Sequence, residues 1–352
     1  MISAIQIEEP EVSDLREESR ARLMNTRELI EKREHEILSP YAARADESRG
    51  RKVAEEPCDI RTDYQRDRDR IIHSKSFRRL MHKTQVFIAP EEDHYRTRLT
   101  HTIEVSQIAR TIARGAGLNE DLTEAIAMGH DLGHTPFGHQ GEFVLDRIYS
   151  KGFRHNEQSL RVVDVLESSS ERRGMNLTEE VRDGILNHTG PTLPMTVEGQ
   201  VVKISDRIAY INHDIDDAIS SGIITTEDLP QESIRILGRT HKERIDTLVR
   251  DMISNTYGQP EARLSEEKYR IMNDLRRFMF KNVYNDPRVK CIEEIEDIDN
   301  IIGGLFDYYM VHPEGLPSYL KVLEDEYDRE DLVKDYIAGM TDRYAFHAYR
   351  KL

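Results

Sequence analysis

Apolar residues recur along this chain at the spacing of an α-helix, and this pattern constrains its fold more than any other feature. The clearest example begins near Thr100, where residues three or four positions apart share one helix face: His101, Val105, Ile108 and Ile112. No stretch alternates apolar and polar residues between turn signals, as strands would, and no segment repeats at a fixed period. The sequence therefore predicts an all-α fold.

Glycine and asparagine mark where the predicted helices end and begin. Gly115 and Gly117 end the first of these helices, and Asn119 is suited to cap the next. That next helix has one apolar face, formed by Leu122, Ile126 and His130. Further helices are expected over about 156–170, 178–188 and 200–220.

The ends of the chain differ in character from its middle. Residues 13–39 are very polar with a thin apolar stripe, which predicts an exposed N-terminal helix that ends before Pro40 and lies on a partner subunit. Residues 41–60 resemble a loop, as does the segment from Gly222 to Pro230. We therefore expect three regions: residues 1–60 as helix and link, 61–222 as a core, and 223–352 as a helical region that packs on the core and completes its site.

Charge and cysteine content narrow the classes of protein to consider. The formal net charge of −16 argues against a protein that wraps nucleic acid electrostatically. Two cysteines, Cys58 and Cys291, supply neither a disulfide framework nor a cysteine zinc site. The N-terminal sequence MISAIQIEEP lacks the features of a signal peptide, and no segment reads as a membrane span, so we expect a cytoplasmic protein.

A basic segment stands out in this acidic chain. From Arg61 to Lys83 there are eight lysines and arginines against three aspartates, just before the first metal-ligand candidate. A run of charge is usually a solvated helix face, and the arginines from 61 to 79 are then salt-bridge partners at the surface. The position of the segment nevertheless favours contact with a small anionic ligand. We expect no more than two of these arginines to contact it.

Histidines are concentrated in one glycine-rich window, GHDLGHTPFGHQGE. His130, His134 and His139 lie within it, and His155 follows closely. His130 ends an amphipathic helix on its buried face, and Asp131 brings a carboxylate to the same point. Because a buried charge is costly unless it is paired or bound to a metal, this doublet indicates a cation site.

A closed metal site needs ligands from more than one helix. His101 supplies one from the inward stripe of its own helix, and Asp206 supplies another from the segment KISDRIAYINHDIDD. Imidazole and carboxylate together suit Mn, Fe, Zn or Co and tolerate Mg. Four such ligands leave open positions on an octahedral ion for water or a substrate oxygen.

The ordered motifs resemble those of the deoxyguanosine triphosphate triphosphohydrolase family of the HD superfamily. They run from about Arg66 to Ala345: RDRDRIIHSKSFRRLMHKTQVF, RTRLTHTIEVSQIAR, GHDLGHTPFGHQGE, RHNEQSL, SDRIAYINHDIDD and DYIAGMTDRYA. The resemblance implies an HD-domain helical bundle with additional N- and C-terminal helices. It also implies hydrolysis of a deoxynucleoside triphosphate, dGTP among them, to deoxynucleoside and inorganic triphosphate.

The resemblance assigns roles to individual positions. The implied metal ligands are His101, His130, Asp131 and Asp206. His139 matches the histidine against the scissile phosphate, which is suited to protonate the leaving 5′-oxygen, and Glu142 matches the carboxylate that orients it. Residues implied near phosphate or sugar are His134, His155, Arg98, Arg207, Tyr210 and Asp214. Gln85 matches the residue that binds the 3′-hydroxyl, and Val86 would press on the sugar where a 2′-hydroxyl would stand.

Structural roles compete with several of these assignments. His134 would then only stabilise its turn, His155 would only begin a helix, and Val86 would be a core residue. Without the resemblance, Tyr210 reads as a packing residue and Asp214 as a solvated acid. Base preference and the C-terminal phosphate contact of some family members are left open.

Two other functions compete as well. One is a different HD phosphohydrolase, a 5′-nucleotidase or cyclic-nucleotide phosphodiesterase, for which the KTQVF segment and the pair His139 and Glu142 have no evident use. The other is a regulator that binds nucleotides or single-stranded DNA, since a basic patch serves either ligand. The resemblance also implies a homo-oligomer, commonly a hexamer, and in some members a response to nucleotides or DNA at distant sites.

Overall fold

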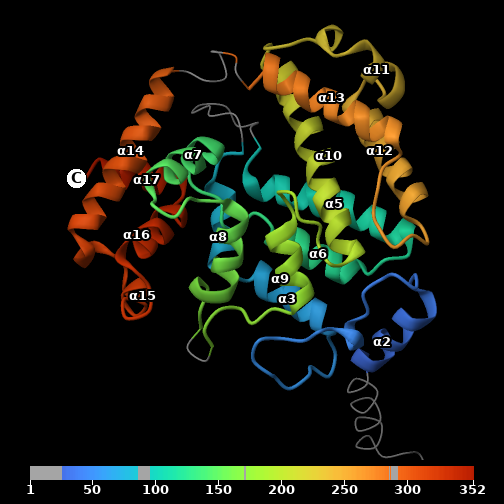
Figure 1. The fold of residues 1–352 in the computed structure, drawn as a ribbon, viewed down its shortest axis with the longest axis horizontal. Coiled ribbons are helices and arrows are strands. Elements are labelled where there is room, and N and C mark those ends of the chain that lie inside the picture. Colours follow the sequence, from blue (N-terminus) through green and yellow to red (C-terminus); the bar gives the residue numbers. More distant parts are fainter. Residues whose placement is uncertain (1–25, 86–95, 170–171, 285, 287–291) are drawn as a thin grey trace, which may run out of the picture.

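The computed structural model of the chain describes residues 26–85, 96–169, 172–284, 286 and 292–352, with the side chains of 292–296 left out. These residues form sixteen α-helices, labelled α2 to α17 (Figure 1). Within the described ranges the only β-type pairing is two isolated bridges, Arg51 with Thr178 and Thr84 with Thr97. The all-α prediction is therefore confirmed.

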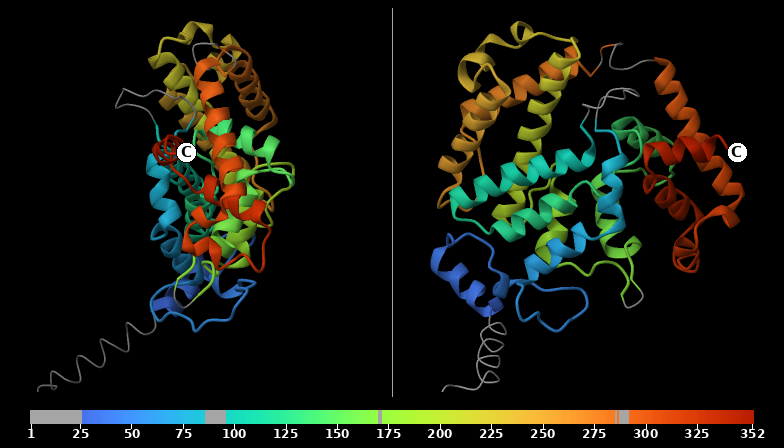
Figure 2. Two further views of the ribbon diagram at one scale, coloured as in Figure 1. Left: turned by 90° about the vertical axis from the view of Figure 1, so that its left-hand side faces the viewer. Right: turned by 180° about the vertical axis from the view of Figure 1, so that it is seen from behind.

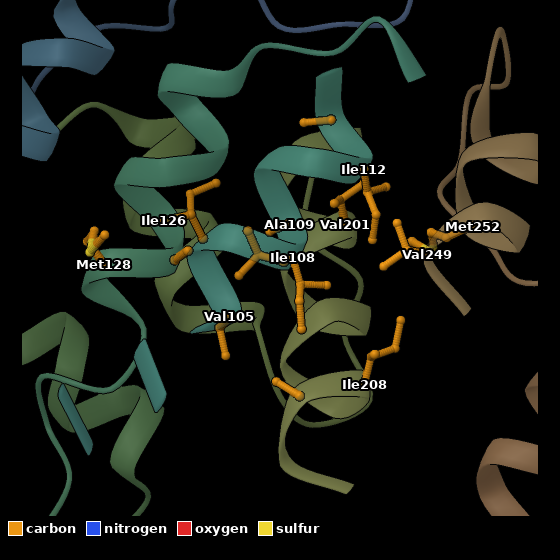
Figure 3. Close-up of a cluster of buried hydrophobic side chains, with 14 of the residues drawn as sticks. Val105, Ile108, Ala109, Ile112, Ile126, Met128, Val201, Ile208, Val249 and Met252 are labelled. Atoms are coloured by element: carbon orange, nitrogen blue, oxygen red, sulfur yellow. The ribbon is translucent and has the colours of Figure 1, made fainter. Parts of the chain in front are cut away.

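The main hydrophobic core forms where α5 (Arg98–Ala116) packs against α6 (Glu120–Gly129), α10 (Val197–Ser220) and α12 (His241–Thr256). Figure 3 shows Val105, Ile108 and Ile112 of α5 pointing among side chains of these neighbours. The other helices that contribute buried residues to this core are α3 (Asp63–Ile72), α4 (Lys75–Arg79), α9 (Glu179–Asn187), α11 (Gln231–Leu237) and α13 (Glu266–Asn282). The apolar stripe predicted from Thr100 is thus buried.

Local signals set the boundaries of α5 and α6 as expected. Gly117 ends α5 in a left-handed conformation with φ +71°, which glycine adopts without steric cost. The side chain of Asn119 then accepts a hydrogen bond from the Leu122 N–H and caps α6. The two helices are consequently joined by a short turn that brings their ends close together.

A second, smaller core holds the C-terminal helices. Its buried residues come from α7 (Gly138–Ile148), α14 (Ile292–Val311), α15 (Ser318–Lys321), α16 (Arg329–Ala338) and α17 (Asp342–Tyr349). In Figures 1 and 2 these C-terminal helices lie beside α7, on the opposite side of the molecule from α11, α12 and α13. The region expected over 223–352 therefore contributes to both cores, and α7 connects the second core to the glycine-rich window.

The N-terminal helix is exposed where it is described. Helix α2 (Thr26–Ile37) leaves Leu29 and Ile37 more than half exposed and ends before Pro40, as predicted; residues 13–25 of the predicted helix lie outside the described residues. The link over 41–60 contains a single short 3-10 turn, Ala45–Glu47. The segment from Gly222 to Pro230 is likewise irregular apart from a 3-10 turn, Thr226–Asp228.

The helices predicted after the histidine-rich window are present with shifted ends. Helix α8 (His155–Arg161) continues as a π-helical turn, Val162–Leu166, and α9 and α10 follow. Most arginines of the basic segment pair with acids: Arg61 with Asp69, Arg66 and Arg70 with Glu55, and Arg68 with Asp121 and Glu124. Among the described helices, none combines the length and the apolar character that a membrane span requires.

Candidate metal centre and reaction site

Four predicted ligands meet at one buried point. His101 lies on α5, His130 and Asp131 at the end of α6, and Asp206 on α10. The ligand atoms of His101, His130 and Asp131 lie within 4.8 Å of one another. An oxygen of Asp206 lies 3.0 Å from Nε2 of His101 and 3.8 Å from Nε2 of His130. The packing of α5 against α6 and α10 thus assembles the set that the sequence predicts.

The state of His130 shows that this set suits a cation. Its Nδ1 is 2.6 Å from the carbonyl oxygen of Ala127, which can only accept, so Nδ1 carries a proton and Nε2 is the ring nitrogen left to bind an ion. That Nε2 atom is buried and has no hydrogen-bond partner among the described residues. It faces carboxylate oxygens of Asp131 and Asp206 at 3.7 and 3.8 Å. Two carboxylates buried around a ring nitrogen without a hydrogen-bond partner are costly by themselves and are stabilised by a positive ion between them.

Electrostatics keep the two carboxylates ionised. Burial opposes ionisation of Asp131, but Arg98 and the surrounding histidines hold its pKa well below the usual value. The Arg98 guanidinium donates to Asp131 at 2.9 Å, and both side chains are buried. Burial also opposes ionisation of Asp206, but the hydrogen bond from His101 and the charges of His101, His130 and His188 together lower its pKa. Arg98 therefore positions a ligand carboxylate. Its contact with substrate stays a prediction.

A second group of side chains adjoins this centre at the start of α7. The ligand-type atoms of His134, His139 and Glu142 lie within 4.8 Å of one another. His139 is exposed, and its Nδ1 lies 3.5 Å from an oxygen of Glu142, one helical turn later. His134 is buried, and its Nε2 is 3.5 Å from Asp131. An accessible imidazole thus stands beside a carboxylate next to the metal centre, which is the arrangement that acid–base chemistry needs.

Glu142 also makes a bond that the sequence does not predict. Its oxygens accept from the backbone N–H and the Nδ1–H of His155, at 2.9 and 2.8 Å. The His155 ring stacks on His134 with centroids 4.1 Å apart. Burial opposes protonation of His155, but the hydrogen bond to Glu142 and the charges of Glu142 and Asp131 together raise its pKa. His155 is the first residue of α8, which agrees with the alternative that it begins a helix, but it also lies within the site.

His188 is a site residue that the sequence analysis missed. It follows α9, is buried, and its Nε2 lies 3.3 Å from Nε2 of His155. Its ring centroid lies 5.1 Å from that of His130. Burial lowers its pKa to about 3, so the ring is neutral. The signal was present, because His188 continues the buried stripe of Val181 and Ile185 as His101 continues the stripe of α5.

Of the two residues predicted to contact the sugar, the structure describes one, Gln85. Gln85 is buried, and its side-chain oxygen has no hydrogen-bond partner in the part of the chain that the structure describes. Its backbone carbonyl accepts from Arg98 at 3.4 Å, which places it beside the metal centre. Val86 lies outside the described residues. A buried amide oxygen without a partner fits a ligand hydroxyl, because an unsatisfied buried acceptor costs about 1–3 kcal/mol.

The remaining predicted substrate residues follow Asp206 along α10. Arg207 and Tyr210 are half-buried. Asp214 is buried rather than solvated, so that alternative for it is wrong; burial raises its pKa to about 7, although a hydrogen bond from Tyr284 opposes the shift. Tyr284 comes from the segment after α13, far away in sequence, and was not predicted. For Tyr210, substrate binding stays a prediction beside the alternative of a packing role.

Comparison with known proteins agrees with this site. Residues 98–211 match the HD domain, and residues 262–351 match a phosphohydrolase-associated domain. The first range contains all four candidate ligands together with His134, His139, Glu142 and His155. HD domains bind divalent metal ions, so the buried histidine and aspartate set has the expected cofactor class.

Relatives match over nearly the full chain. A deoxyguanosinetriphosphate triphosphohydrolase-like protein of Caldanaerobacter subterraneus subsp. tengcongensis is 59% identical, covering 94% of this chain and 96% of its own length. Proteins of the same name from Desulfatibacillum aliphaticivorans and Clostridium tetani are 47% and 45% identical; they cover 94% of this chain and 98% and 96% of their own lengths. A hypothetical protein structure from Aquifex aeolicus shares 19% identity over 81% of this chain and 69% of its own, with a TM-score of 0.45, too distant to add to the argument.

Proposed function

The chain belongs to the family of deoxyguanosinetriphosphate triphosphohydrolase-like proteins, and from that premise we propose that it hydrolyses deoxynucleoside triphosphates to deoxynucleoside and inorganic triphosphate. Family membership and the HD domain make it a metal-dependent phosphohydrolase. The observation that carries the finer proposal is the position of His139 and Glu142 directly beside the buried ligand set. Attack at the α-phosphorus requires a proton donor at the 5′-oxygen, and these residues are suited to supply it.

We propose His101, His130, Asp131 and Asp206 as the ligands of a divalent ion: Mn, Mg, Fe, Co or Zn. When bound, such an ion supplies positive charge to phosphate oxygens and makes a water molecule a stronger nucleophile. Arg98 holds Asp131 in its ionised form, and the Ala127 carbonyl fixes the tautomer of His130. The described side chains thus orient the ligand set before any metal is bound.

His139 is the proposed general acid. Its exposed ring is accessible to a substrate, and Glu142 at 3.5 Å from its Nδ1 can orient the ring so that Nε2 gives a proton to the leaving 5′-oxygen. Because Glu142 is also tied to the backbone and ring of His155, its own position is fixed. His134 and His155 are the proposed neighbours of the phosphates, together with Arg98 and Arg207.

The sugar is proposed to lie against Gln85 and Val86. The unpartnered oxygen of Gln85 can accept a hydrogen bond from the 3′-hydroxyl. Tyr210 and Asp214 complete this end of the site from α10. Tyr284, which donates to Asp214, shows how the region from 223 onward reaches a predicted substrate residue and supports the proposal that this region completes the nucleotide site.

Product identity tests the proposal directly. The purified protein is incubated with each of the four deoxynucleoside triphosphates, dGTP first, with Mn²⁺ or Mg²⁺, and products are separated by chromatography. We expect deoxynucleoside and triphosphate. A deoxynucleoside monophosphate with pyrophosphate would contradict the assignment of His139 and Glu142. Turnover of nucleoside monophosphates or cyclic nucleotides alone would favour the other HD phosphohydrolases, and nucleotide or DNA binding without turnover would favour a regulator.

Assembly and location belong to the same proposal. From the family resemblance we propose a cytoplasmic homo-oligomer, a hexamer in the first instance, whose exposed α2 contacts a partner subunit. Deoxynucleoside triphosphates are the proposed small-molecule partners, with single-stranded DNA or a regulatory nucleotide as additional ones. Light scattering of the purified protein with and without residues 1–37 tests the oligomer, since a change of mass is expected if α2 lies at a subunit contact.

A further inference from the structure

Three chain segments that are distant in sequence meet beside the reaction site. One is 83–85, which ends in the proposed sugar residue Gln85. The second is 134–138, the turn that leads from the metal ligands into α7 and its His139. The third is 338–342, the junction between α16 and α17. The motif DYIAGMTDRYA, singled out in the sequence, contains this third segment, and the proposed function assigns it no role.

The first two segments are in direct backbone contact. A Cβ atom placed on Gly138 would lie 2.9 Å from the carbonyl oxygen of Gln85, closer than side-chain contacts allow. Gly138 has φ +59°, which favours glycine for a second reason. The start of α7 therefore packs directly against the backbone of Gln85, the residue proposed to bind the sugar. A small movement of either segment would change the distance from Gln85 to His139, the two ends of the proposed substrate site.

One carboxylate of the third segment holds both of the others. Asp342, the first residue of α17, accepts from the backbone N–H of Thr84 with one oxygen and from the N–H of Phe137 with the other, each at 2.9 Å. Thr84 is adjacent to Gln85, and Phe137 is two residues before His139. Phe137 has φ +61°, an uncommon conformation for a residue with a side chain, so this turn needs an external partner to keep its shape.

A buried lysine makes a second connection at the same place. The ammonium group of Lys83 donates to the carbonyl oxygens of His134 and Ala338, the latter at 2.8 Å. Its backbone carbonyl accepts from the N–H of Arg98 at 3.0 Å. Lys83 is buried and faces Asp342, Arg79, Arg98 and Asp131. The end of α16 is thereby fixed to the turn that carries His134.

From these contacts we propose that Asp342 is a positioning residue, which sets the distance between the sugar-binding segment at Gln85 and the acid–base helix at His139. This inference rests on the proposed function for the identity of the two ends. Asp342 binds the backbone N–H groups of Thr84 and Phe137, and through them it positions Gln85 and His139. Reactions of bound phosphate esters depend steeply on such distances, and a misplacement of about 1 Å can cost about a hundredfold in rate.

The structure offers a matched control at the other end of α7. Glu330, in the first turn of α16, accepts from the backbone N–H of Ser150 at 2.8 Å and from its hydroxyl. It is a carboxylate from the same C-terminal helices that binds a backbone N–H just beyond the C-terminus of α7. Glu330→Ala therefore removes the same kind of cross-link without changing the end of α7 that carries His139.

Hydrogen exchange tests the contact without requiring activity. Amide exchange of the full-length protein is compared for the wild type, Asp342→Ala, Asp342→Asn and Glu330→Ala, below the unfolding temperature of each. We expect faster exchange at both Thr84 and Phe137 in Asp342→Ala, and at Ser150 in Glu330→Ala. Asp342→Asn keeps one acceptor oxygen, so faster exchange is expected at only one of the two amides. Unchanged exchange at Thr84 and Phe137 in Asp342→Ala would overturn the proposal.

Kinetics of the same four proteins test the consequence. With a deoxynucleoside triphosphate and Mn²⁺, we expect kcat/KM to fall at least tenfold in Asp342→Ala, by less in Asp342→Asn, and within twofold of wild type in Glu330→Ala. Metal content is expected to be equal in all four. Equal kcat/KM in Asp342→Ala and Glu330→Ala would overturn the positioning role. If the wild type itself forms no deoxynucleoside and triphosphate, the proposed function fails, and the exchange result still decides whether Asp342 holds the two segments.

Discussion

Asp206 brings a carboxylate from α10 to the ligand atoms of α5 and α6, and its oxygen is 3.0 Å from His101. We predict that Asp206→Ala loses the bound metal and most activity while its helical content stays near that of the wild type. Removing one of four ligands greatly weakens metal binding, whereas a core of this size does not depend on one polar group. Metal analysis and far-UV circular dichroism of the purified variant measure the two effects.

Asp216 provides the control for this prediction, since it lies on the same helix with its side chain half exposed. Asp216→Ala should retain the metal content of the wild type. Full metal occupancy in Asp206→Ala would remove Asp206 from the ligand set, even if activity were lost.

Gln85 and Val86 lead to a prediction about sugar choice. Gln85→Ala should lower turnover of deoxynucleoside triphosphates without admitting ribonucleotides, because it removes the acceptor for the 3′-hydroxyl. Val86→Gly should admit some GTP or ATP hydrolysis, because crowding of the 2′-hydroxyl costs roughly 1–3 kcal/mol. The measurement is the ratio of deoxynucleotide to ribonucleotide turnover. If neither variant changes that ratio, discrimination lies elsewhere and Val86 is a core residue.

Two of the ligand residues, His101 and His130, could be predicted from the sequence because each continues an apolar stripe of its helix, whereas Asp131 and Asp206 were assigned from their motifs. His101 and His130 occupy positions where a leucine would ordinarily be buried, and a buried polar residue in such a stripe needs a partner. The bond of Glu142 to His155 and that of Tyr284 to Asp214 could not be predicted, since each joins segments whose packing no local pattern specifies. Sequence identifies which side chains are buried, but their partners depend on how the helices pack.

Helix boundaries followed local signals where those signals were sufficient. The cap at Asn119 and the left-handed Gly117 depend only on nearby residues, so α5 and α6 end and begin as predicted. The π-helical turn after α8 depends on contacts from outside it. There the carbonyl of Val162 accepts from Glu167, and that of Val163 accepts from the distant Met175 N–H at 2.6 Å. A periodic apolar pattern does not distinguish this turn from a continued α-helix.

The turn carrying Asp131 is packed against α8 through Gly133. A Cβ atom there would lie 2.1 Å from the backbone nitrogen of Ser159 and 2.5 Å from the carbonyl oxygen of His155. We predict that Gly133→Ala destabilises the protein by about 3 kcal/mol or more, beyond ordinary overpacking, because backbone atoms must move. It should also lower activity by displacing His155. Thermal unfolding and dNTP turnover are the measurements.

Gly303 is the matched control for this substitution. It lies within α14, and an added Cβ would meet no atom within 4 Å. Gly303→Ala should be neutral or stabilising, since alanine favours a helix over glycine by about 1 kcal/mol. Similar losses in both variants would show that the close approach at Gly133 does not matter for stability.

The molecule as a whole is built around two cores, and the partly buried Leu166, in the π-helical turn after α8, packs against both. Helix α7 begins beside the metal centre, while Val144 and Leu145 on its inner face belong to the C-terminal core. The sequence analysis treats 223–352 as one region and does not indicate that its residues up to Val283 join the main core and those from Ile298 onward the second. An apolar stripe predicts that a helix face is buried, but it does not identify the segment that packs against that face. Through α7, the C-terminal core holds the helix that carries the acid–base residues His139 and Glu142.

Glu198 ties the N-terminal link to the main core. It is fully buried in the first turn of α10, and its carboxylate accepts from the backbone N–H groups of Ala43 and Asn119, both at 3.0 Å. Burial raises its pKa to about 7 from the usual 4.5, although these hydrogen bonds oppose the shift. Between these two pH values the folded protein binds more protons at Glu198 than the unfolded chain does. Its contribution to the free energy of unfolding therefore falls as pH rises from 4.5 to 7.

We predict that Glu198→Gln removes this loss of stability. Glutamine keeps an acceptor oxygen for the two N–H groups but cannot ionise, so the cost of a buried charge disappears. A shift of this size corresponds to a change on the order of 3 kcal/mol across the range, or about 4 °C in the unfolding temperature for a chain of this length. Thermal unfolding of metal-free wild type and variant at pH 5 and pH 8 measures the difference.

The exposed Glu324 serves as the control, and Glu324→Gln should follow the pH dependence of the wild type. Metal-free protein is required because protons compete with a metal for histidine and carboxylate ligands, which would add a pH dependence of the opposite sign. If Glu198→Gln loses as much stability between pH 5 and pH 8 as the wild type, Glu198 is not the group responsible. If it is less stable at both values, the two backbone hydrogen bonds need the carboxyl group itself, whether ionised or not, and attachment of the N-terminal link depends on that group.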